Sequence, residues 1–111
     1  MGWLVGRKIK KEKKTGTTTD DWETVFNEYC GDFSTKIVYV RNTGANSLDY
    51  EIIGDLDDLG EDDVSVTSGS LASGDVLVAE ITRNYYKLKL RVRSTTAGSS
   101  TDYVAKINFQ V

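Results

Sequence analysis

The residue types that most often carry out acid–base or metal chemistry are scarce in this chain. It has no His and a single Cys among 111 residues, so the commonest zinc ligands and the usual general base near neutral pH are nearly absent. No nucleophile, base and orienting group occur together in a recognisable context. We therefore expect no enzyme, no metal and no cofactor, and we expect the lone Cys30 to be an inert thiol, buried or half-buried.

The densest group of potential metal ligands is an acidic loop at residues 55–63. Read as an EF-hand loop beginning at Asp55, it has Leu59 at one ligand position and Val66 in place of the bidentate Glu. We expect a solvated loop that does not bind Ca²⁺ tightly, the alternatives being a weak Ca²⁺ site or a pair of glycosidase-type carboxylates. The loop is also a candidate contact surface through its six carboxylates: Asp55, Asp57, Asp58, Glu61, Asp62 and Asp63.

Charge divides the chain into two parts. Residues 1–16 hold six basic residues against one acid, a net +5, whereas the rest of the chain has a net charge of −8. We predict that residues 1–19 form a basic arm outside the folded domain, with residues 1–16 ordered only on assembly. One alternative is a solvated leader. The other is a nucleic-acid contact, which is disfavoured because the acidic body would repel a polyanion. The arm's candidate subunit or capsid contacts are Trp3, Leu4, Arg7, Lys8, Lys10, Lys11, Lys13 and Lys14.

Nothing in the sequence predicts contact with a membrane. The longest apolar run, around residues 37–40, is far too short to span a bilayer. The basic run also follows the first apolar residues instead of preceding them, so we expect no export signal.

Alternation of apolar and polar residues predicts strands after residue 20. The first strand places Trp22, Thr24 and Phe26 on one face. A six-residue connection, 42–47, predicts a hairpin between the second and third strands, and a Ser/Gly turn is expected at 68–70. The expected strands are 20–29, 36–41, 48–53, 64–67, 75–82, 85–94 and 102–111.

The strand at 85–94 has two contrasting faces. Its apolar face contains Tyr86, Leu88, Leu90 and Val92, and its basic face contains Lys87, Lys89, Arg91 and Arg93. The basic face predicts either a polyanion-binding stripe or a ladder of ion pairs. We favour a ladder with Asp49 and Glu51, because the body is acidic and supplies the partners.

About seven strands separated by turn residues, with no helical periodicity, predict an all-β fold. The expected architecture for residues 20–111 is an antiparallel β-sandwich, Ig-like or jelly-roll-like. The chain has no Pro to protect its sheet edges, so neighbouring subunits are candidates to cover them.

Three segments of the chain resemble small β-sandwich proteins of tailed-phage virions: residues 36–47, 71–75 and 85–93. The resemblance implies a non-enzymatic capsid decoration subunit or a tail accessory subunit, made in the host cytoplasm and incorporated into the virion. Its implied partners are further copies of itself, as in a trimer, and a major capsid or tail protein. The alternative is a carbohydrate-binding or adhesion module that uses Trp22, Tyr29, Tyr39 or Tyr103 as a stacking platform.

Overall fold

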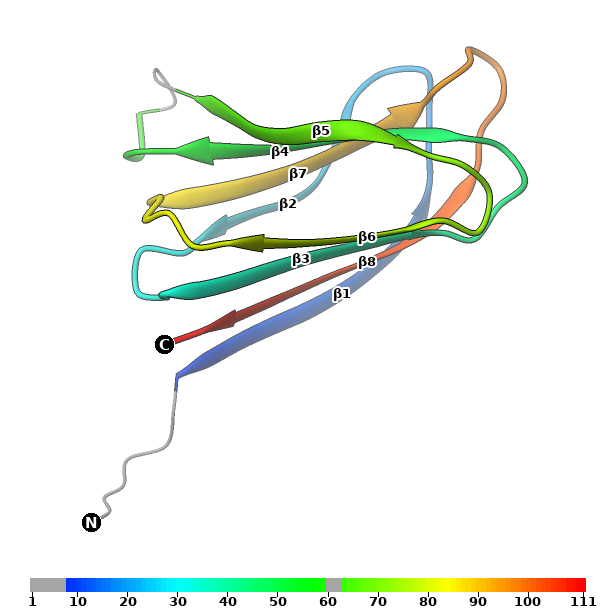
Figure 1. Cartoon of the computed structure of the whole chain (residues 1–111). Helices are drawn as coiled ribbons and strands as arrows, with labels where there is room; N and C mark the ends of the chain where they lie inside the picture. Colours follow the sequence, from blue (N-terminus) through cyan, green and yellow to red (C-terminus); the bar gives the residue numbers. More distant parts are fainter. Residues whose placement is uncertain (1–7, 60–62) are drawn as a thin grey trace.

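The computed structural model describes residues 8–59 and 63–111, which form two four-stranded sheets packed face to face (Figure 1). Sheet A has the strand order β1-β8-β3-β6 and sheet B the order β2-β7-β4-β5, and neighbouring strands are antiparallel throughout. The described residues contain no helix that could cross a membrane. The strands are β1 (Ile9–Thr17), β2 (Glu23–Tyr29), β3 (Thr35–Asn42), β4 (Leu48–Asp55), β5 (Val64–Leu71), β6 (Val76–Ile81), β7 (Lys87–Ser94) and β8 (Asp102–Gln110).

The path of the chain is that of a double-sheet jelly roll. Among the described strands, only β4 and β5 are consecutive in sequence and paired in the same sheet, and every other connection crosses between the sheets. The predicted all-β sandwich, including its jelly-roll-like form, is confirmed. The structure has one strand more than expected, because the basic residues 9–17 also form a strand.

The core lies between the sheets and is built by period-two alternation. In β7, Leu88, Leu90 and Val92 are at most 3% exposed, so the predicted apolar face of this strand is confirmed. Tyr86 is the exception: it is 37% exposed, and Tyr85 is buried instead. Tyr86 precedes the strand, where its backbone N–H donates to the carbonyl of Asp55 and turns its side chain outward.

The predicted hairpin at residues 42–47 is wrong, because β3 and β4 belong to different sheets. A connection of this length is long enough to cross the roughly 10 Å between packed sheets. The buried side chain of Asn42 fixes the corner by donating to the carbonyls of Asn46 and Leu71, at 2.7 and 2.9 Å. Its amide oxygen accepts from the N–H of Gly44 and the hydroxyl of Thr101.

Two further strand predictions differ from the structure. In β2, a bulge between Thr24 and Phe26 breaks the alternation, so that Val25 and Phe26 are both buried. The expected turn at 68–70 is the second half of β5, where Ser68 and Ser70 pair with β4. Small polar residues resemble a turn in sequence, but here they lie on an exposed edge strand, where Ser70 donates to Asp49.

Residues 9–17 are a strand of the sandwich and not an arm outside it. β1 pairs with β8 along its whole length, from Ile9 opposite Gln110 to Thr17 opposite Asp102. The boundary expected near residue 20 is therefore wrong for this segment. The sequence misled because β1 carries charged residues on both faces, so it shows no apolar alternation.

Candidate interaction surfaces

The outer face of sheet B carries the ladder of ion pairs expected from the sequence. Arg91 lies opposite Glu51 and Arg93 opposite Asp49 in the register of β7 and β4. The Arg91 Nε donates to Glu51 at 2.9 Å, and the Arg93 Nε donates to Asp49 at 3.2 Å. The ladder prediction is therefore confirmed, and these two arginines already have partners within the chain.

Trp22 covers this ladder from the segment before β2. Its ring lies 4.5 Å from the guanidinium carbon of Arg91 and 4.4 Å from that of Arg93, measured to the ring centroid. Both distances are within the range of a cation–π contact. The tryptophan is thus half-buried against the arginines of its own domain.

Both carboxylates of the ladder are held in the charged form. A hydrogen bond from Ser65 and then the contact with Arg91 lower the pKa of Glu51. Burial opposes the charge of Asp49, but hydrogen bonds from Ser70, Thr95 and Arg93 outweigh it and lower the pKa of this carboxyl as well. The ladder on the outer face of sheet B is therefore a network of polar contacts within the chain.

The outer face of sheet A is different, because apolar side chains point to solvent there. Val78 lies opposite Tyr39, and Tyr39 lies opposite Lys106. Val78 is 63% exposed and Val76 46%. We call this surface the apolar–basic face and define it by Lys11, Lys13, Ile37, Tyr39, Arg41, Val76, Val78, Val104 and Lys106.

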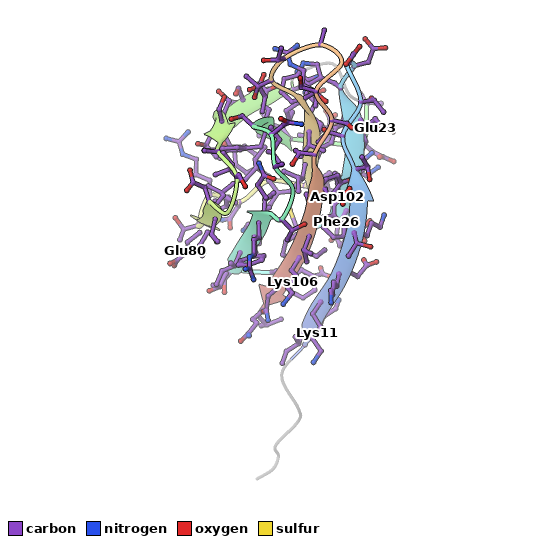
Figure 2. All side chains as sticks on the ribbon, turned by 90° about the vertical axis from the view of Figure 1, so that its right-hand side faces the viewer. Lys11, Glu23, Phe26, Glu80, Asp102 and Lys106 are labelled. Atoms are coloured by element: carbon purple, nitrogen blue, oxygen red, sulfur yellow. The ribbon has the colours of Figure 1, made fainter. Side chains whose placement is uncertain are left out.

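The basic half of this face lies over β1 and β8. Lys13 is opposite Lys106 in the register, and Figure 2 shows Lys11, Lys106 and Glu80 on three strands of sheet A. Lys106 lies 5.4 Å from the ring centroid of Tyr39. Within residues 8–59 and 63–111, none of Lys11, Lys13 and Lys106 forms an ion pair with a carboxylate.

A shallow hollow of about 360 Å³ lies between β1 and β8 on this face. Its lining includes Lys11, Lys13, Lys106 and Asn108. Because long lysine stems are apolar up to the ammonium group, such a hollow suits an apolar side chain flanked by negative charge. The apolar signal was visible in the sequence, since Ile37–Val40 and Val76–Ala79 are apolar on both faces of their strands.

The inward side of β1 holds two more lysines of the predicted contact set, and Lys8 lies just before the strand. Lys10 forms an ion pair with Glu28 of β2 at 3.1 Å, and Lys14 donates to the carbonyl of Val25 at 2.9 Å. Lys8 pairs with Asp32. These three lysines are therefore engaged within the domain, while Lys11 and Lys13 face outward. Trp3, Leu4 and Arg7 lie outside the described residues.

Two carboxyls meet at this polar seam between β1 and β2. A hydrogen bond with Glu28 raises the pKa of Glu12, and the same bond, with Lys10 beside it, lowers the pKa of Glu28. Inward-pointing charges on an edge strand protect it from pairing with other chains. Polar and charged contacts, instead of apolar packing, therefore join β1 to β2 at this edge.

The acidic loop between β4 and β5 combines charge with exposed leucines. Leu59 is 71% exposed and Leu56 59%. Asp58 pairs with Lys87, and Asp55 and Asp57 accept hydrogen bonds from backbone N–H groups two residues further on. Asp63 is exposed, and Glu61 and Asp62 lie outside the described residues. The part of the chain that the structure describes holds no group of three potential metal ligands.

The four aromatic residues considered as alternatives for a stacking platform do not all share a surface. Tyr103 is 9% exposed and belongs to the core. Tyr39 lies on the outer face of sheet A, whereas Trp22 and Tyr29 belong to the segment leading into β2 and to β2 itself. Tyr29 packs edge-on against Tyr86, with ring centroids 4.9 Å apart. The described residues therefore form no surface that brings all four aromatic rings together.

Cys30 is fully buried, as expected. Its thiol donates to the carbonyl of Tyr85 at 3.2 Å, and burial raises its pKa to about 11. Because the thiolate is the reactive form, this cysteine is inert in the folded protein.

Comparisons with known proteins identify the fold but no family. No family model matches the chain, and no curated protein matches it in sequence. Among solved structures, PirA is similar with a TM-score of 0.65 at 12% identity, covering 87% of this chain and 92% of that one. The SPBc2 prophage-derived protein YomS is similar with a TM-score of 0.63 at 14% identity, covering 97% and 99%.

A third similar structure comes from the disulfide-linked pili of Bacillus endospore appendages. It has a TM-score of 0.59 at 14% identity and covers 96% of this chain and 92% of that one. At such identities the likeness concerns the fold alone. This jelly roll is thus shared with a prophage-encoded protein and an appendage protein, among others of different description.

Proposed function

We propose that this protein is a non-enzymatic structural subunit of a phage virion, most specifically a capsid decoration subunit that oligomerises and binds the particle surface. The observation that carries the proposal is the apolar–basic face. Val78 and Val76 expose apolar surface beside Lys11, Lys13 and Lys106, which have no described acidic partner. Contiguous apolar surface rimmed by charge is typical of a protein–protein contact.

The similar structures support this proposal by precedent. One of them is prophage-derived and another forms pili, so the same fold serves a phage-related protein and an assembled one. Those pili are disulfide-linked, whereas the single thiol of this chain is buried at Cys30. Assembly of this subunit would therefore rest on noncovalent contacts, through surfaces such as the apolar–basic face.

We retain the N-terminal residues before β1 as a second contact with the particle. Trp3 and Leu4 supply apolar groups, and Arg7 supplies charge. A deletion that tests this idea must stop at residue 7, because residues 9–17 are a strand of sheet A. Removing residues 2–7 should weaken particle binding while leaving the unfolding transition of the sandwich in place.

The proposal is tested by locating the protein and by measuring its attachment. Mass spectrometry of purified virions, separated into heads and tails, should find the chain with the heads. Purified protein should also bind particles that lack it, and binding should weaken as salt is raised, because exposed charges are screened. Recovery with tails alone would favour a tail accessory subunit, and absence from the virion would contradict the proposal.

A further inference from the structure

The three most exposed large apolar side chains of the described chain lie on two surfaces of opposite charge. Leu59, at 71%, and Leu56, at 59%, project from the acidic loop. Val78, at 63%, lies on the apolar–basic face. Each surface exposes apolar side chains to water beside charged residues. The two surfaces are complementary, because their apolar groups can pack together and their charges are opposite in sign.

We propose that the partner on the apolar–basic face is residues 55–59 of a second copy of this chain, with Leu59 seated in the hollow between β1 and β8. This inference rests on the proposed function and names the neighbour that the face receives. Residues 55–59 form the inserted half of the contact. The receiving half is formed by Lys11, Lys13, Lys106 and Val78.

Size and charge favour this occupant. A leucine side chain fits a shallow hollow of about 360 Å³ whose lining includes lysine stems. Three lysines and one acid, Glu12, line that hollow, so its lining has a net positive charge. Asp57 lies two residues from Leu59 in the inserted loop. Opposite charges around an apolar contact fix its orientation and speed its formation.

The same geometry excludes a contact of the loop with its own sheet A. The loop joins β4 to β5 at one end of sheet B, and the hollow lies on the outer face of the opposite sheet (Figure 1). Every copy therefore carries both halves of the contact. The halves can be exchanged reciprocally in a dimer or repeated around a closed ring.

The experiment is sedimentation velocity of the purified full chain over a range of concentrations and salt. The wild-type chain should form oligomers that dissociate as salt is raised, because screening weakens the charged rim. Leu59→Ser should raise the dissociation constant about tenfold or more, as expected for loss of a buried leucine. Val78→Asp should act in the same direction.

The matched control is Thr24→Asp, which places the same charge on the exposed outer face of β2 in sheet B. It should leave the dissociation constant unchanged. The charged part of the contact is tested by Asp57→Asn and Lys106→Gln, because Asn preserves the turn that Asp57 makes with the N–H of Leu59. Their effects on the dissociation constant should be less than additive when combined.

Several outcomes would overturn the inference. They are a chain that stays a single subunit at every concentration, oligomers that resist Leu59→Ser and Val78→Asp, and an equal effect of Thr24→Asp. Failure of the proposed function is seen separately, in virion composition and particle binding. If the chain self-associates as described but is absent from virions, the contact between copies is supported and the proposed function is contradicted.

Discussion

The two outer faces of the sandwich both belong to four-stranded antiparallel sheets, but their surface chemistry differs. On sheet B, Arg91 and Arg93 are bound by carboxylates and covered by Trp22. On sheet A, Val78 is exposed and Lys106 contacts only the ring of Tyr39 among its described partners. The arginines of sheet B therefore have their partners within the chain, whereas the proposed contact with a second copy would supply partners to the outer face of sheet A.

This contrast separates stability from assembly. Residues of the sheet B ladder contribute to the free energy of unfolding of the monomer. Residues of the apolar–basic face should contribute little to it, because their apolar surface stays in water in the monomer. The following substitutions test that separation, beginning with the core that both faces share.

The largest loss of stability should come from truncating the core beneath the ladder. Leu90 is 1% exposed, and Leu90→Ala should lower the free energy of unfolding by about 2–5 kcal/mol. Lys89→Ala, on the outward side of the same strand, should cost far less. The measurement is urea unfolding of both variants, and equal losses would mean that the faces of β7 are assigned wrongly.

A smaller loss should follow from breaking the ladder. Arg91→Ala removes the ion pair with Glu51 and the contact with Trp22. Such a pair on a sheet contributes about 0.2–1 kcal/mol, and the cation–π contact adds about 0.5–1 kcal/mol. A double-mutant cycle of Arg91→Ala and Glu51→Ala should show coupling in the free energy of unfolding. Strictly additive effects would show that the pair contributes nothing.

Acid should weaken the ladder on sheet B. The pKa values of Asp49 and Glu51 are lowered in the folded protein from 3.8 and 4.5, so the unfolded chain binds more protons in this range. Their contribution is complete above those values and is lost as the pH falls through the lower, folded pKa values. Urea unfolding between neutral pH and about pH 3 should therefore show a shallower decline for Glu51→Gln than for the wild type.

The control for this pH series is Glu80→Gln on the outer face of sheet A. Glu80 is exposed and forms no ion pair within the described residues. Its removal should leave the acid slope as it is in the wild type. An equal change of slope in both variants would contradict a role specific to the ladder.

The smallest effect on stability should come from the apolar–basic face. Val78→Ser changes a side chain that is 63% exposed, and such surface substitutions usually alter the free energy of unfolding by less than about 0.5 kcal/mol. Measured at concentrations where the chain is a single subunit, the variant should unfold like the wild type. A loss as large as that of Arg91→Ala would remove the distinction between the two faces.

The sequence predicts strands well where one face is apolar and the other polar. β7 and β8 have this pattern, and the inward positions of Leu90 and Phe109 follow from it. Sheet membership does not follow from it, because a six-residue connection suits a hairpin and a crossing between sheets equally well. The hydrogen bonds of Asn42 decide that corner, and they depend on Leu71 and Thr101, which are distant in sequence.

β1 and the apolar–basic face were missed for the same physical reason. Lys10 and Lys14 look solvated in the sequence, but their partners, Glu28 and the carbonyl of Val25, come from another strand. Val76 and Val78 look like core residues in a run that is apolar on both faces. In both places the role of a residue depends on which strand lies beside it, and alternation does not contain that information.

The pairing of β1 with β8 has a consequence for synthesis of the chain. Ile9 and Gln110 are partners, so sheet A cannot be completed until its last strand has left the ribosome. Contacts between such distant residues also make folding slow. Throughout this interval β1 is an unpaired strand, and its lysines keep it hydrated and repel other nascent copies. We therefore expect the lysines of β1, which form polar contacts with β2 in the folded protein, also to oppose aggregation of the incompletely synthesised chain.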